Sequence, residues 1–183
     1  MGIDGGRLGV SVSCLKTADL PSPVQGVHMK PHLVILASDA FKEKSQPNVL
    51  AALNKEEGFD SSERYRTTKL LDVLLTRQLG RKNLFQSGKV ILNSVNPGLC
   101  RSELMKNVPP LTKWTAEEGA KNLLWGSLED NIPPGSYISS CRVIDPSGYV
   151  LSEEGKKIQE KVWNEVGDLL VNVVPEVATV WRM

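Results

Sequence analysis

The chain has 183 residues, of which 40% are hydrophobic and 23% are charged, and its formal net charge is +1. This composition describes one globular domain with a substantial core and excludes a disordered or fibrous protein. The balance of 22 basic and 21 acidic residues gives no reason to expect a nucleic acid or an acidic membrane as partner. The three cysteines are widely spaced, which fits a reducing compartment, and no apolar run is long enough to cross a membrane, so we expect a cytoplasmic protein.

Residues 1–30 are rich in Gly, Ser and Pro and show no useful periodicity, so we treat them as a poorly defined N-terminal segment. The two histidines, His28 and His32, flank Pro31. The proline argues against the helix that would bring both imidazoles onto one ion, so we expect no metal site.

A continuous apolar run at residues 33–37, bounded by Pro31 and Ser38, predicts a buried strand of a parallel sheet. A charged stretch follows at residues 42–59, with a short helix expected near residues 49–53. The serine is therefore placed at the tip of a strand, where the sites of α/β proteins commonly form.

The next segment predicts the most strongly periodic helix of the chain. A capping-box pattern from Asp60 to Glu63 opens it, leucines in its second half give it a wide apolar face, and Gly80 ends it. Tyr65 and Lys69 lie four residues apart near its start, so both side chains project from one face. An ammonium beside a phenol favours the phenolate, which allows proton exchange with a carbonyl or an alcohol. Taken alone, the pair could equally be part of a solvated helix surface.

The remaining elements continue the alternation of strands and helices. We expect a strand at residues 89–95 that stops at Asn96-Pro97-Gly98, a helix at 115–128, a strand at 137–144 and an amphipathic helix at 152–170. This order predicts an α/β layer structure with a mostly parallel sheet. Because the carboxyl ends of parallel strands meet at one edge, Ser38 and the Pro97-Gly98 turn should lie near each other.

These parts, in this order, resemble the short-chain dehydrogenase/reductase family, in which a strand-end serine, a Tyr-x-x-x-Lys helix and a Pro-Gly turn surround a nicotinamide. Further stretches look like a fungal branch of that family, namely residues 31–35, 48–54, 64–65, 67–71, 96–104 and 151–155. The resemblance implies a partial Rossmann-like, three-layer catalytic half-domain at residues 31–176, followed by a C-terminal tail at 177–183. The interval from Ser38 to Tyr65 is longer than the family usually has, and residues 42–59 would be the insertion.

The resemblance also implies catalytic roles for three residues. Tyr65 would be the general acid/base, and Lys69 would assist it while hydrogen-bonding the nicotinamide ribose. Ser38 would hold and polarise the substrate oxygen, as a preorganised donor does when charge develops. A serine that simply caps the turn after the strand is the structural alternative.

The cofactor implied by the resemblance is NADP, although the preference over NAD is not readable from the sequence. Besides the tyrosine and the lysine, its contacts would come from Pro97, Gly98, Leu99 and Ser102. Gly98 would let the backbone approach the nicotinamide closely, because a side chain there would collide with the ring. An ordinary Pro-Gly turn is the alternative here.

The family's phosphate-binding turn, Thr-Gly-x-x-x-Gly-x-Gly, has no match in residues 1–30, where the glycines are spaced differently. No asparagine precedes Asn48, so the family's upstream catalytic asparagine has no counterpart either. We therefore expect the C-terminal half of a reductase. Its exposed sheet edge would favour a homo-oligomer or a partner that covers the edge.

The leading hypothesis is an oxidoreductase that interconverts a ketone and an alcohol with NADP(H), acting on a small-molecule carbonyl or alcohol. The fungal resemblance suggests a tailoring step in secondary metabolism, by analogy alone. The alternatives are a truncated, non-catalytic relative that serves as an interaction module, a degraded gene product, or a gene whose start lies further upstream.

Overall fold

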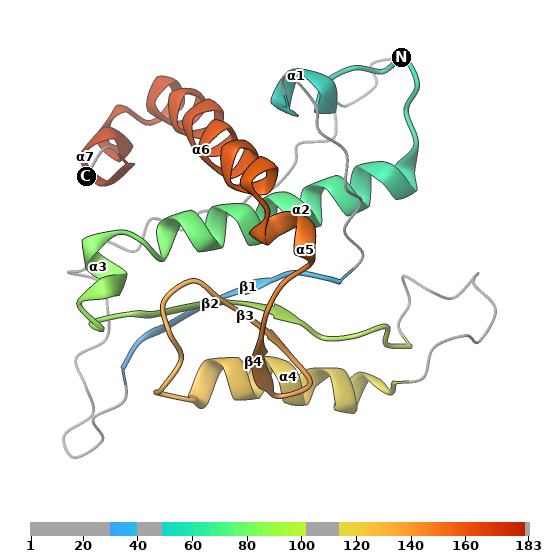
Figure 1. Cartoon of the computed structure of the whole chain (residues 1–183), viewed down its shortest axis with the longest axis vertical. Helices are drawn as coiled ribbons and strands as arrows, with labels where there is room; N and C mark the ends of the chain where they lie inside the picture. Colours follow the sequence, from blue (N-terminus) through green and yellow to red (C-terminus); the bar gives the residue numbers. More distant parts are fainter. Residues whose placement is uncertain (1–29, 40–48, 102–113, 182–183) are drawn as a thin grey trace, which may run out of the picture.

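The computed structural model of the chain describes residues 30–39, 49–101 and 114–181, and the fold concerns these residues. Its centre is a four-stranded sheet in the order β1-β2-β3-β4. The strands are β1 (His32–Leu36), β2 (Ile91–Asn96), β3 (Ser136–Ser139) and β4 (Arg142–Ile144). The first three are parallel and β4 is antiparallel to β3. Helices cover both faces of the sheet (Figure 1), which confirms the predicted α/β architecture with a mostly parallel sheet.

The last two strands correct a prediction. The sequence predicts one strand at residues 137–144, whereas the chain reverses at Ser140 and Cys141 and returns as a hairpin. Both residues have left-handed backbone angles, with φ of 54° and 53°. Two left-handed residues in succession match the twist of an antiparallel pair and form a tight turn. No glycine, proline or asparagine marks this turn, so the usual sequence signals of a hairpin are missing.

One face of the sheet is covered by α2 (Ser61–Leu79) and, outside it, α6 (Glu153–Val173), as Figure 1 shows. The Asp60 carboxylate caps α2 by accepting the Glu63 backbone N–H at 2.7 Å. The short helices α1 (Val49–Leu53) and α5 (Gly148–Leu151) pack against α6. The buried core on this side consists of Ala37, Val49, Leu70, Leu71, Val73, Leu74, Tyr137, Val150 and Val162.

The opposite face carries α4 (Ala116–Leu128), which begins at a complete capping box formed by Thr115 and Glu118. The carbonyl of Gly126 joins this helix to the sheet, because it lies 3.1 Å from His32 Nδ1 and accepts Asn93 Nδ2 at 2.8 Å. A Cβ on Gly126 would lie 2.8 Å from a methyl of Val95, so the glycine permits this close approach. The core here is smaller and consists of Ile91, Val95, Ile132 and Ile138.

Four short elements of the described residues were not apparent in the sequence pattern: α3 (Asn83–Gln86), α5, the 3-10 helix η3 (Pro175–Val177) and α7 (Ala178–Trp181). The last of these packs on α6 through Trp181, whose ring stacks on Trp163 with centroids 3.7 Å apart. In the described part of the chain, no helix combines the length and the apolar character that crossing a membrane requires.

Candidate active site

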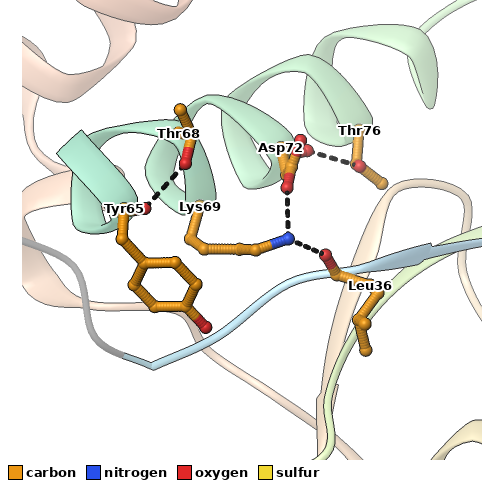
Figure 2. A network of polar contacts seen from close by, with 6 residues as sticks. All are labelled: Leu36, Tyr65, Thr68, Lys69, Asp72 and Thr76. Atoms are coloured by element: carbon orange, nitrogen blue, oxygen red, sulfur yellow. Dashed lines mark hydrogen bonds and ion pairs between the residues drawn. The ribbon is translucent and has the colours of Figure 1, made fainter. Parts of the chain in front are cut away.

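Tyr65 and Lys69 lie in the first turns of α2, close to the end of the helix that Asp60 caps. Figure 2 shows that both side chains leave the helix on the same side and extend toward β1. The Tyr65 side chain is 44% exposed, and its ring lies over the carboxyl end of β1. The structure therefore brings the phenol and the ammonium to one flank of α2, at the sheet edge where the sequence predicts a site.

The Lys69 ammonium is held by two acceptors from different parts of the chain (Figure 2). Lys69 Nζ donates to the Leu36 carbonyl at 2.8 Å and to Asp72 Oδ2 at 3.0 Å. Pro31 O and Ala37 N both form hydrogen bonds to β2. Neighbouring residues of a strand direct their backbone groups to opposite sides, so the Leu36 carbonyl lies on the side of β1 that faces away from β2. Lys69 thus donates to a carbonyl at the outer edge of β1. An ammonium has three N–H groups, and two of them are used here, so the third can donate to a further acceptor.

Asp72 is a part of the site that the sequence interpretation missed. Burial raises the pKa of the Asp72 carboxyl, while the hydrogen bond and the charge of Lys69 act in the opposite direction. The two side chains are 22% and 34% exposed, so the ion pair lies partly inside the protein. The three-residue spacing of Lys69 and Asp72 could have indicated this ion pair, because residues three apart on a helix are neighbours.

Ser38 follows β1 by two residues and is half-buried. Leu36 pairs with Val95 in the β1–β2 register, so Ser38 is level with Pro97 at the ends of neighbouring parallel strands. The serine and the Pro-Gly turn therefore stand at the ends of neighbouring parallel strands, and Figure 2 shows Tyr65 and Lys69 extending toward the first of these strands.

The turn after β2 is fixed by its own backbone and by Asn96. Gly98 has a φ of +83°, in the left-handed region, and its N–H donates to Asn96 Oδ1 at 3.0 Å. Leu99 is 51% exposed beside it. A side chain at Gly98 would meet the ring of Trp114 at an ordinary distance of 3.7 Å. The glycine is thus required by the turn itself, whether or not a ligand approaches.

Two predicted features lie outside the described residues. Ser102, expected to contact the cofactor, is one of them, and most of the N-terminal segment 1–30 is the other.

A buried amide on α4 supports the same turn and was also missed in the sequence. Asn122 is 2% exposed; its Nδ2 donates to Pro97 O at 3.4 Å and its Oδ1 accepts the Cys141 backbone N–H at 2.6 Å. The Cys100 thiol donates to the same proline carbonyl at 3.3 Å, and burial raises the pKa of this thiol. Asn122 therefore joins the strand-end turn to the β3–β4 hairpin.

Together these groups can bind and protonate an oxygen atom. The Tyr65 phenol is a proton donor near the end of β1 (Figure 2), and Lys69 adds a positive charge beside it. Ser38, two residues beyond that strand, carries a hydroxyl. Such donors stabilise negative charge that develops on a bound oxygen. The spare ammonium N–H and the side-chain-free backbone at Gly98 suit the ribose and ring of a nicotinamide, so the residues present fit that end of the cofactor.

Comparison with known proteins gives a consistent set of relatives. No protein-family model matches the sequence. A short chain dehydrogenase/reductase of Cryptosporiopsis sp. (strain 8999) is 32% identical over 167 residues, which are 82% of this chain and 52% of the relative. A short chain dehydrogenase of Alternaria solani is 35% identical over 120 residues, 58% of this chain and 41% of the relative. One of Gibberella zeae is 27% identical over 168 residues, 82% of this chain and 49% of the relative.

A solved structure shares the fold. A crystal structure of an uncharacterized protein from Mycobacterium paratuberculosis superposes with a TM-score of 0.52 and 16% sequence identity, covering 74% of this chain and 48% of that one. The chain spans about half the length of the curated relatives it matches.

Proposed function

Because the chain belongs to the short-chain dehydrogenase/reductase family, we propose that it acts in the interconversion of a ketone and an alcohol with NADP(H). The observation that carries this proposal is the placement of Tyr65 and Lys69 side by side over the end of β1, at the level of Ser38. The phenol and the ammonium both extend toward the end of β1, which Ser38 follows by two residues.

Proton transfer is the step assigned to the chain's own residues. Tyr65 would give its phenolic proton to the carbonyl oxygen during reduction and take it back during oxidation. Ser38 would donate a hydrogen bond to the same oxygen and hold it in place. The Lys69 ammonium would place a positive charge near that oxygen while negative charge develops on it.

Cofactor binding is proposed for the nicotinamide end. Lys69 would use its third N–H for a ribose hydroxyl while Leu36 and Asp72 hold the other two. The backbone of Pro97, Gly98 and Leu99 would line the ring, with Ser102 beyond them. When bound, the cofactor supplies the hydride, and the protein supplies orientation. NADP rather than NAD, and a tailoring step in fungal secondary metabolism, belong to the proposal as well.

The test uses the purified chain with NADPH and a panel of ketones, with cofactor oxidation followed by absorbance and cofactor binding by calorimetry. Tyr65→Phe should lower turnover by about a hundredfold or more, because it removes the proton donor, and should leave binding and folding unchanged. Thr68→Val is the matched control: it removes a hydroxyl from the same helix, one that only donates to the Tyr65 backbone carbonyl. Equal turnover for Tyr65→Phe and the unmodified chain would refute the proposed role.

A second candidate is a non-catalytic relative that acts as an interaction module. The observation that favours it is that residues 1–30 contain no match to the Thr-Gly-x-x-x-Gly-x-Gly turn that binds the pyrophosphate in the family. In that case the unmodified chain neither binds NADPH nor oxidises it. Any cellular effect lost on deleting the chain is then retained with Tyr65→Phe.

A further inference from the structure

Asn96 joins two strand ends beside the Pro97-Gly98 turn. It is the last residue of β2 and is 4% exposed. Its Oδ1 accepts the Gly98 N–H at 3.0 Å, and its Nδ2 donates to Ser139 Oγ at 3.3 Å. Ser139 is the last residue of β3 and pairs with Asn96 in the parallel register. One buried amide therefore ties the turn after β2 to the end of the next strand.

An amide suits this position because it supplies both an acceptor and a donor. A side-chain oxygen that accepts the N–H two residues later forms an Asx-turn, which reverses the backbone directly after the strand. Gly98 holds its left-handed φ of +83° within that turn. Asn96→Ala would leave the Gly98 N–H without this acceptor and Ser139 Oγ without this donor. The turn would then lose the contact that fixes its position against β3.

Three side chains of the described residues hold this turn, and all three are uncharged. Besides Asn96, the Cys100 thiol and the Asn122 amide donate to the Pro97 carbonyl at 3.3 and 3.4 Å. Burial raises the pKa of the Cys100 thiol, so the thiol stays protonated at neutral pH. A carboxylate at position 96 could accept the Gly98 N–H as well as an amide does. The hydrogen bond alone therefore does not explain why the anchor is neutral.

The charge of the nicotinamide gives a reason. The ring is uncharged in NADPH and positively charged in NADP+, so a carboxylate beside it would favour the oxidised form. We propose that Asn96 is a positioning residue, which holds the Pro97-Gly98 backbone for the nicotinamide ring without a charge that would favour one redox state. This inference rests on the proposed function, in which the same turn lines the ring. Asn96 acts through the turn and requires no contact of its own with the cofactor.

Calorimetry of the full chain with NADPH measures the positioning. Asn96→Ala should weaken NADPH binding about tenfold, because the looser turn must be ordered when the ring binds. Ser139→Ala removes only the acceptor of Nδ2 and should weaken binding about threefold. Ser94→Ala is the matched control and should leave binding unchanged. It removes a hydroxyl of the same strand that donates to the Ser136 carbonyl of β3 at 3.4 Å, away from the turn.

Asn96→Asp tests the charge. Its carboxylate keeps an acceptor for the Gly98 N–H, and the Ser139 hydroxyl can rotate to donate to the other oxygen. Once the carboxyl is ionised, the affinity for NADP+ relative to NADPH should rise about tenfold. The ratio of the two affinities should therefore increase between about pH 5 and about pH 9 in this variant and stay level in the unmodified chain. A purely structural role would change both affinities together.

Amide hydrogen exchange at Gly98 without cofactor measures the turn independently and should be faster in Asn96→Ala. Asn96→Asp keeps both hydrogen bonds and decides the question if thermal unfolding shows that Asn96→Ala is not folded. An unmodified chain that binds no NADPH would refute the proposed function and this inference with it. Where the unmodified chain binds NADPH, equal binding by a folded Asn96→Ala, or a ratio in Asn96→Asp that does not change with pH, overturns this inference alone.

Discussion

Helices α2 and α4 each follow a strand of the sheet and cover one of its faces, but they do so with opposite kinds of residue. Helix α2 buries Leu70, Leu71, Val73, Leu74 and Thr76. Helix α4 buries only Gly119, Asn122 and Gly126 and leaves two leucines in contact with solvent. The first helix is held mainly by fully buried apolar side chains. The second is held by close approach and hydrogen bonds, together with the half-buried Leu123 and Trp125 that pack on the smaller core.

This difference bears on what each helix can do. The second half of α2 is anchored in the larger core and covered by α6, so its first turns can hold Tyr65 and Lys69 in a fixed position over β1. Helix α4 instead fixes the Pro97-Gly98 turn through Asn122 and keeps an apolar surface outside. One helix presents the proposed chemistry, and the other supports the turn at the end of β2.

The largest effect is expected from a leucine of α2. Leu74 is fully buried, so Leu74→Ala should lower the free energy of unfolding by about 3 kcal/mol, through lost burial and the cavity that remains. Leu124→Ala on α4 is the matched change at an exposed site and should cost less than about 0.5 kcal/mol. Urea unfolding measures both losses. Similar losses for the two variants would mean that the helices are not held differently.

A smaller loss is expected at the buried amide of α4. Asn122→Ala leaves the Cys141 N–H without its 2.6 Å acceptor and removes a donor to Pro97, which should cost about 2 kcal/mol. Amide hydrogen exchange at Cys141 should become faster. Exchange in the second half of α2 should change only as much as the lower free energy of unfolding of the whole protein requires. Asn164→Ala, at an exposed position of α6, is the control. An unchanged exchange rate at Cys141 would show that the amide does not hold the hairpin.

The same contrast explains how far the sequence predicts the fold. Helix α2 was predictable almost to the residue, because Asp60, the leucine pattern and Gly80 are local signals that agree with one another. The β3–β4 hairpin was not, because Ser140 and Cys141 adopt left-handed angles without the usual glycine or asparagine. Local signals fail where tertiary contacts decide the conformation.

The candidate site likewise has some features that the sequence predicts and others that it does not. Shared helical spacing and parallel strand ends place Tyr65, Lys69 and Ser38 together without any structure, although their roles remain predictions. The bond from Lys69 to the Leu36 carbonyl joins residues far apart in the chain, and no spacing rule indicates it. Asp72 was within reach of a spacing rule, but an aspartate three residues from a lysine is common on solvated helices.

The smallest effect is expected at Asp72, where the test is whether burial or the charge of Lys69 has the greater influence on the pKa of the carboxyl. Burial raises the pKa of this carboxyl above its ordinary value of 3.8, so the folded protein binds the proton more tightly than the unfolded chain does. A raised carboxyl pKa means that folding stability is lost as the pH rises through the window that begins near the unfolded value. Asp72→Asn resembles the protonated side chain at every pH and removes this dependence.

The stability of Asp72→Asn relative to the unmodified chain should therefore increase as the pH rises from about 3 to about 6. Urea unfolding at several pH values measures the difference, with Asp168→Asn, exposed on α6, as the control. A difference that instead falls with rising pH would mean that the attraction of Lys69 outweighs burial. The ion pair would then stabilise α2 itself, because both residues lie on that helix, and it would orient Lys69 toward the Leu36 carbonyl of β1.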